Sequence, residues 1–182
     1  MKLLINIFIQ TVFFIAVFVF ISWIRELKLL PTNGDTLVPD VQLQAVVLKK
    51  SDSSEQLANL ISSRDFVGQA TLFYFWAPWC SVCKLSMPNL QEFHLSQVDN
   101  PKSKQVKVVA VALSYESEQE VINYLQERKY GFTSVLGDQQ VSDAFKISAF
   151  PTYYLIDKNG YLVSKSMGYS TELGMILRSF IL

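Results

Sequence analysis

The sequence predicts an α/β domain, with a mixed central sheet flanked by helices, behind an N-terminal single transmembrane helix. Strand-like and helix-like segments alternate along most of the chain, and a hairpin pattern follows them, which together predict the domain. The membrane helix is predicted because no charged residue occurs from Leu3 to Ile24. A length of 182 residues suits one domain plus an appendage better than two full domains.

The uncharged segment at the start is long enough to cross a bilayer. At about 1.5 Å per residue its helix would reach about 33 Å, against a hydrocarbon core of about 30 Å. It has no polar stripe, and it ends in Ser22-Trp23-Ile24-Arg25-Glu26, without the small residues of a signal-peptide cleavage site. We therefore expect a transmembrane anchor over residues 1–24, a linker over 25–37 and a domain over 38–182. Basic residues flank the segment on both sides, so charge bias does not orient the domain.

From residue 71 onward the expected order is strand, helix, strand, helix, hairpin and helix, with parallel crossovers first and an antiparallel edge last. The runs TLFYFW and VKVVAVAL have the length and the β-branched or aromatic content of buried strands. Asn159-Gly160 supplies the positive φ angles that a tight hairpin needs, and alternation should bury only one of Tyr153 and Tyr154. The predicted strands span residues 41–46, 71–76, 106–113, 152–156 and 161–166.

Four helices are expected in the domain. Pro88 should kink the one that begins at Cys80, and Ser117 and Glu120 have the spacing of a capping box at the start of the next. The predicted helices span residues 55–63, 80 onward, 117–129 and 171–182.

Composition excludes several classes of function. Sixteen basic and sixteen acidic residues balance, so no basic excess indicates binding to nucleic acid. Two cysteines cannot build a disulfide framework or a four-thiolate zinc site, and His94 is the single histidine. We therefore expect no resident metal.

The motif Cys80-Ser81-Val82-Cys83 at a strand-to-helix junction carries the predicted chemistry. The first cysteine lies at a helix N-terminus, where unpaired N–H groups and the helix dipole stabilise a thiolate. The second lies one turn later and can attack a mixed disulfide formed by the first. We expect thiol–disulfide exchange with Cys80 as the attacking thiolate, Cys83 as the resolving thiol, and no cofactor beyond this redox-active pair.

Two other roles for the cysteines stay open. A structural disulfide is possible, although so short a loop adds little stability. The alternative function is a copper chaperone that binds Cu(I) through both thiols, with Met87 and His94 as candidate further ligands.

Further motifs make residues 38–182 resemble the thioredoxin superfamily: Pro88, Phe150-Pro151-Thr152, Asn159-Gly160 and Gly168. The resemblance implies a thioredoxin fold in which Phe150-Pro151-Thr152 is a cis-proline element facing the cysteines. A cis-proline exposes neighbouring backbone groups, with which an extended substrate segment can pair.

Residues beside these motifs are expected to support the site. Trp79 should be exposed and, with Phe150, Pro151 and Thr152, should bind substrate. Trp76 should pack beneath the site. Lys84 either stabilises the thiolate or is simply a solvated helix residue.

Within the superfamily the chain is similar to the membrane-anchored, extracytoplasmic TlpA/ResA-like branch. Tyr74-Phe75-Trp76-Ala77, the cysteine motif and Gly168-Tyr169-Ser170 resemble the suppressor of copper sensitivity protein D (ScsD) group. This resemblance implies a single-pass inner-membrane protein with a periplasmic domain that serves cell redox homeostasis. Its implied partners are protein thiols and disulfides, and a DsbD-like membrane electron-transfer reductase.

The chain also departs from the superfamily pattern. Thioredoxins have a buried aspartate at the position of Tyr74, where a carboxylate would accept the proton of the resolving thiol. Cytochrome c maturation reductases often have a glutamate at the position of Ser86. No histidine lies between the cysteines to lower the pKa of Cys80, so we expect a reductase rather than an oxidase.

Overall fold

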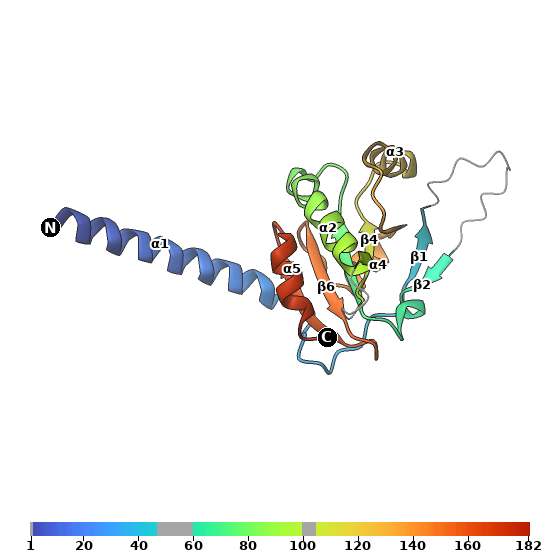
Figure 1. The fold of residues 1–182 in the computed structure, drawn as a ribbon, viewed down its shortest axis with the longest axis horizontal. Helices are drawn as coiled ribbons and strands as arrows, with labels where there is room; N and C mark the ends of the chain where they lie inside the picture. The colour runs from blue at the N-terminus through green and yellow to red at the C-terminus, as the bar shows by residue number, and fades with distance from the viewer. Residues whose placement is uncertain (1, 47–59, 100–104) are drawn as a thin grey trace.

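The computed structural model describes residues 2–46, 60–99 and 105–182, and within them it shows a seven-stranded sheet with helices on both faces (Figure 1). The strands are β1 (Gln42–Ala45), β2 (Leu60–Ser62), β3 (Thr71–Trp76), β4 (Lys107–Ala112), β5 (Thr133–Leu136), β6 (Thr152–Ile156) and β7 (Leu162–Met167). The helices are α1 (Lys2–Leu27), the 3-10 turn η1 (Ser63–Phe66), α2 (Ser81–Asp99), α3 (Glu118–Arg128), α4 (Gln139–Ala144) and α5 (Glu172–Ser179).

The sheet is mixed, as the sequence predicts, with the strand order β2-β1-β5-β4-β3-β6-β7. β3, β4 and β5 are parallel, whereas β6 and β7 form the predicted antiparallel edge. Phe75, near the end of β3, pairs with Thr152, the first residue of β6. Because these strands run in opposite directions, the turn after β3 and the loop before β6 lie at the same edge of the sheet.

Both faces of the central strands are covered. Tyr74 and Trp76 face the core cluster that contains residues of α2, α3 and α5, whereas Phe73 and Phe75 face α4 and the residues after α1. All six residues of β3 are therefore buried. The same packing buries both Tyr153 and Tyr154, so the expectation that only one would be buried is wrong.

Three elements, β5, α4 and the 3-10 turn η1, were not predicted, and a fourth, β2, was predicted as a helix. β5 and α4 are short, with four and six residues, so their apolar pattern is weak. Residues 60–62, the end of the predicted helix over 55–63, form β2 instead, because they pair with β1. Residues 55–59 lie outside the described part of the chain.

The N-terminus of α3 has half of the predicted capping box. Ser117 Oγ accepts a hydrogen bond from the backbone N–H of Glu120 at 3.2 Å, as expected. The Glu120 carboxylate, however, accepts from the backbone N–H of Glu116 rather than from that of Ser117.

The hairpin between β6 and β7 uses a single positive φ. Gly160 has φ of +87°, but Asn159 does not adopt a positive φ. The Asp157 carboxylate organises the turn instead, accepting from the N–H groups of Asn159 at 2.9 Å and Tyr161 at 2.8 Å.

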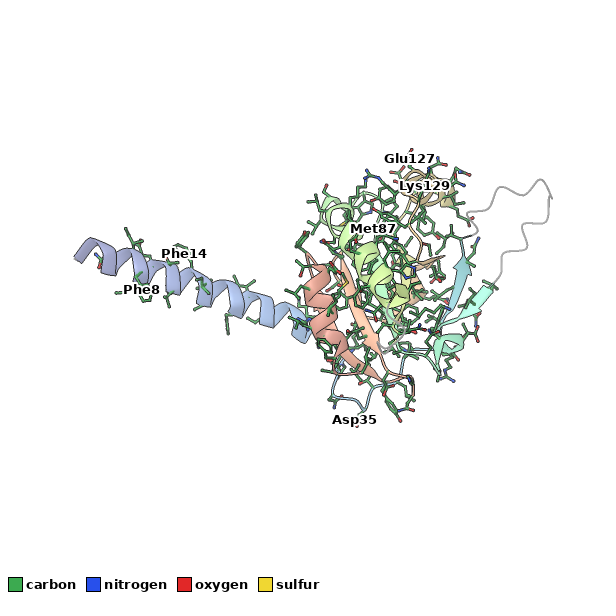
Figure 2. The ribbon with its side chains drawn as sticks, viewed as in Figure 1. Phe8, Phe14, Asp35, Met87, Glu127 and Lys129 are labelled. Carbon is green, nitrogen blue, oxygen red and sulfur yellow. A yellow bond between two sulfur atoms is a disulfide. The ribbon has the colours of Figure 1, made fainter. Side chains whose placement is uncertain are left out.

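α1 projects from the domain, and Phe8 and Phe14 point to opposite sides of it (Figures 1 and 2). Over the part of the chain that the structure describes, no helix meets the combined length and apolarity expected of a membrane span. The predicted transmembrane anchor over residues 1–24 is therefore not confirmed.

Residues just after α1 pack against the sheet. Leu29 and Leu30 are buried, although they fall in the segment predicted as a linker. The Leu30 N–H donates to the Tyr154 hydroxyl at 3.1 Å, and Lys165 Nζ donates to the Leu30 carbonyl at 3.2 Å. The chain is thus held to β6 and β7 within a few residues of the end of α1.

Candidate active site

Cys80 and Cys83 form a disulfide at the start of α2. The turn after β3 closes with a hydrogen bond from the Cys80 N–H to the Ala77 carbonyl at 3.1 Å. Cys80 immediately precedes α2, and its Sγ accepts from the backbone N–H of Cys83 at 3.1 Å. This is the helix N-terminal position that the motif predicts for the attacking sulfur.

The two sulfurs differ in access to solvent. Cys80 is 6% exposed, whereas Cys83 is completely buried. A partner molecule can therefore reach only the first cysteine of the pair without rearrangement of the site.

The Phe150–Pro151 bond is cis, as the resemblance implies. The Pro151 carbonyl accepts from the Gly168 N–H at 2.8 Å, and Thr152 Oγ1 donates to the Ala149 carbonyl at 2.9 Å. Gly168 has φ of +103°, a backbone conformation that L side chains rarely adopt. The loop is thus fixed from both sides.

Trp79 connects the cysteine turn to two other loops. Its side chain is 60% exposed, and its ring contacts that of Phe150. Its Nε1–H donates to the Ser114 carbonyl at 2.8 Å. The structure therefore brings the predicted substrate-binding residues of both loops together beside the disulfide.

The predicted supporting residues have different surroundings. Trp76 is buried with its ring 5.3 Å from that of Tyr124, so it packs beneath the site. Lys84 Nζ lies 5.6 Å from the centroid of the Tyr124 ring, which favours a solvated helix residue with a cation–π contact. Pro88 lies inside α2, where it removes one N–H from the helix ladder.

Two exposed apolar side chains on the first turns of α2 were not predicted from the sequence. Val82 and Leu85 are 41% and 67% exposed, next to the disulfide. Cys83, Met87 and Leu90 point inward, so a helical wheel aligned on these three residues identifies the exposed pair. Together with Trp79 they give the surface around Cys80 an apolar character.

Tyr74 occupies the position of the missing carboxylate and is fully buried. Burial raises the pKa of its hydroxyl well above the ordinary value, and a nearby Ser86 hydroxyl offsets this only in part. Among the described residues the Tyr74 hydroxyl has no hydrogen-bond partner of good geometry, and Ser86 Oγ accepts from the Ser170 N–H. Tyr74 thus stays neutral and cannot accept a proton as a carboxylate would.

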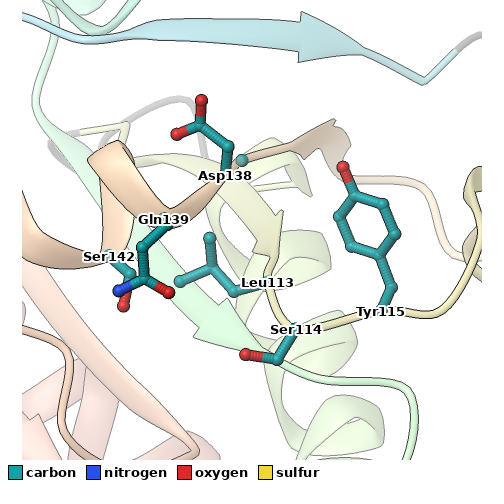
Figure 3. A pocket seen from close by; sticks show the side chains of 7 residues that line it. Leu113, Ser114, Tyr115, Asp138, Gln139 and Ser142 are labelled. Atoms are coloured by element: carbon teal, nitrogen blue, oxygen red, sulfur yellow. The ribbon is translucent and has the colours of Figure 1, made fainter.

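A shallow pocket of about 180 Å³ lies beyond Trp79, at the carboxyl ends of β4 and β5 (Figure 3). Ser114, whose carbonyl accepts from Trp79, is one of its walls. Burial and the nearby charges of Glu118 and Asp138 raise the pKa of the Tyr115 hydroxyl. The pocket is lined by Leu113, Ser114, Tyr115, Gly137, Asp138, Gln139 and Ser142.

The candidate copper ligands do not converge on the cysteines. Met87 is buried in the same core cluster as the disulfide, but His94 lies about two helical turns farther along α2. Its ring packs edge-on against Phe132, and burial lowers its pKa. Within the described ranges, no group of three or more His, Cys, Asp or Glu side chains is placed to hold a metal ion.

Comparison with known proteins identifies the family. A family model described as thioredoxin-like matches residues 68–162. The chain belongs to the thioredoxin-like family. The matched segment runs from just before β3 to the start of β7 and includes both cysteines and the cis-proline loop.

Curated relatives of this chain include proteins named thiol-disulfide oxidoreductase ResA. The one from Oceanobacillus iheyensis is 32% identical over 147 residues, which cover 80% of this chain and 70% of that protein. The one from Bacillus subtilis is 34% identical over 113 residues, covering 62% of this chain and 60% of that protein. The crystal structure of StoA from Bacillus subtilis matches with a TM-score of 0.61 and 23% identity, over 84% of this chain and 100% of that one.

These relatives confirm the predicted enzyme class, a thiol–disulfide oxidoreductase, and the structural neighbour confirms the fold. The closer resemblance to the ScsD group stays a prediction. So do the periplasmic location, the reductase direction and the DsbD-like donor.

Proposed function

We propose that this chain reduces disulfides of protein partners through Cys80 and Cys83, with the cysteine pair as its sole redox group. The difference in accessibility between the two cysteines carries the proposal. Cys80 keeps a small exposed fraction, 6%, in the turn after Trp79, whereas Cys83 is completely buried. A more accessible attacking cysteine and a fully buried resolving cysteine are the arrangement that exchange needs.

The reaction proceeds in two displacements. The Cys80 thiolate attacks one sulfur of the client disulfide, forming a mixed disulfide and releasing the other client sulfur as a thiolate, which takes up a proton. Cys83 then loses its proton and attacks Cys80 Sγ, so that the bond between Cys80 and the client breaks. The second client thiolate leaves, and the Cys80–Cys83 disulfide forms. Two electrons pass to the client, and a dithiol donor, proposed to be a DsbD-like membrane reductase, restores the thiols.

The surroundings of Cys80 support the reductase direction. In the disulfide its sulfur accepts from one backbone N–H, that of Cys83. The neighbouring cation, Lys84, lies over the ring of Tyr124. A disulfide is strongly oxidising when its reduced form is strongly stabilised, and a lysine held over an aromatic ring contributes little to such stabilisation.

We also propose that α1 anchors the domain at the inner membrane, with the domain in the periplasm. Apolar side chains such as Phe8, Phe13 and Phe14 are more than 60% exposed on α1, and so large an exposed apolar surface calls for a lipid or protein environment. A periplasmic location is compatible with a cysteine pair that cycles through a disulfide.

Trapping of the mixed disulfide tests the exchange reaction. Cys83→Ala should accumulate covalent client adducts through Cys80, because the second displacement is blocked. Cys80→Ala is the matched control and should trap none, since Cys83 is buried. Absence of adducts with Cys83→Ala at every redox poise would rule out the exchange mechanism, and Cu(I) binding through both thiols without exchange would favour the copper chaperone.

A further inference from the structure

An exposed apolar stripe runs along α5 and the turn that follows it, near the end of the chain. Leu173 and Leu177 are about one helical turn apart and so lie on the same face of α5, and Phe180 and Ile181 extend this apolar surface into the turn after the helix. Met175, on the other side of the helix, is completely buried in the core. The stripe consists of Leu173, Leu177, Phe180 and Ile181, which are 65%, 58%, 73% and 58% exposed.

α5 lies on the side of the domain from which α1 extends (Figure 1). Lys165 of β7 joins the two elements, because its Nζ donates to the Leu30 carbonyl at 3.2 Å and its own carbonyl accepts from Arg178 Nη1 of α5 at 3.0 Å. α5 is therefore held close to the end of α1. The exposed fractions apply with α1 in place, so α1 does not cover the stripe.

Basic side chains accompany the stripe. Lys28 follows α1 directly and is exposed, and Arg178 is an exposed residue of α5 itself. Glu172 is the acidic residue of α5 and lies in its first turn. Cations beside an apolar helix face suit a surface of anionic lipid headgroups, which attracts basic side chains.

We infer that the α5 stripe binds the surface of a lipid bilayer and holds the domain against the membrane. Its apolar side chains enter the boundary between headgroups and acyl chains, as those of interfacial amphipathic helices do. Lipid is favoured over a protein partner because the stripe adjoins the apolar surface of α1 and carries cations at its margin. The inference rests on the anchor proposed for α1 and is independent of the cysteine chemistry.

Photolabelling of the full chain from within the bilayer tests this contact. The chain is reconstituted in vesicles of phosphatidylethanolamine and phosphatidylglycerol that contain a phospholipid with a photoactivatable acyl chain. After illumination, mass spectrometry should find lipid adducts in residues 172–182 as well as in α1. Adducts in α1 alone would overturn the inference and leave the anchor intact, whereas adducts in neither segment would overturn both.

A matched pair of variants separates a specific contact from general stickiness. Leu177→Ser removes one residue of the stripe, and Leu60→Ser removes an equally exposed leucine on β2, at the opposite edge of the sheet from β7. The yield of α5 adducts should fall several-fold in the first variant and stay unchanged in the second. Disulfide exchange in detergent should be unchanged in both.

Equal adduct yields from Leu177→Ser and the parent chain would contradict the inference. So would protection of residues 172–182 from hydrogen exchange in vesicles without any lipid adduct. That result, with crosslinked dimers, would indicate a second copy of the chain as the occupant of the stripe.

Discussion

The Trp79 indole meets the Phe150 ring edge-on, with 5.7 Å between the ring centroids. Trp79 immediately precedes Cys80, and Phe150 immediately precedes the cis-proline. The contact therefore joins the two loops on either side of the reactive sulfur. The Trp79 ring is also available to a client polypeptide, since it remains largely exposed, whereas Phe150 is half-buried.

Replacement of Trp79 should slow exchange with protein disulfides more than exchange with small ones. An aromatic contact of this kind is worth about 0.5–1.5 kcal/mol, and about 1.4 kcal/mol corresponds to a tenfold change in rate. We expect Trp79→Ala to reduce kcat/KM for a protein disulfide about tenfold, with little effect on a small aromatic disulfide. Stopped-flow measurement with both substrates checks this.

Trp79→Phe is the control for the hydrogen bond to Ser114. It keeps an aromatic ring facing Phe150 but lacks the indole donor. If Trp79→Ala reduced kcat/KM equally for both substrates, the tryptophan would instead act on the reactivity of Cys80 itself.

Two buried tyrosines offer a matched test of hydrogen bonding. The Tyr154 hydroxyl accepts from the Leu30 N–H and donates to the Phe145 carbonyl at 2.9 Å, whereas that of Tyr74 has no partner of good geometry among the described residues. Tyr154→Phe should lower the free energy of unfolding by about 1–3 kcal/mol, because it leaves buried backbone groups unpaired. Tyr74→Phe should be neutral or stabilising, since it removes an unpaired polar group.

Urea unfolding of the two variants checks this difference. A large loss of stability in Tyr74→Phe would mean that its hydroxyl has a partner, such as a buried water molecule.

Alkaline pH should destabilise the fold through its buried tyrosines. Burial raises the pKa of Tyr154 to about 12, and it also raises those of Tyr74 and Tyr124 above the ordinary value of 10.0. The unfolded chain then loses its phenolic protons first, so the contribution is complete below about pH 10 and is lost as the pH rises toward the folded-state values. Denaturant midpoints should fall above about pH 10, and less steeply in Tyr74→Phe.

An added methyl group would be crowded at Gly137, two residues before α4. A Cβ on Gly137 would come within 2.8 Å of Leu113 Cδ2 and 3.1 Å of Val141 Cγ1, whereas one on Gly131 would come no nearer than 3.4 Å to any atom. Gly137→Ala should cost about 1–3 kcal/mol by overpacking, and Gly131→Ala should cost much less. Thermal unfolding of both variants measures the difference, and equal stabilities would show that α4 moves to accept the methyl group.

The strands and helices on either side of the site are predicted accurately from the sequence. β3 coincides with TLFYFW, and α2 begins beside Cys80, because a long apolar run and a helix-starting turn are strong local signals. β5 and α4 are not predicted because they are short and depend on their surroundings. β5 is positioned by pairing with β4, and α4 begins at a polar cap, Asp138, that follows β5.

The candidate site is predictable where a motif marks it. Cys80 and Cys83 are predicted from their spacing, and the cis-proline loop from the family resemblance. The Trp79 contact with Ser114 is not predictable, since a backbone carbonyl has no sequence signature. The burial of both Tyr153 and Tyr154 likewise follows from helices on both faces of the sheet, which alternation along one strand cannot indicate.

The close packing of Leu29 and Leu30 limits how the chain can be shortened for recombinant production. A form that starts at residue 38 would lose both leucines from the core, and the Leu162 N–H would lose the Thr36 carbonyl that accepts from it at 2.8 Å. Such a truncation should aggregate or melt early, whereas one that begins just ahead of Leu29 retains these contacts. Crystallisation trials on the isolated domain therefore depend on where the N-terminal cut is placed.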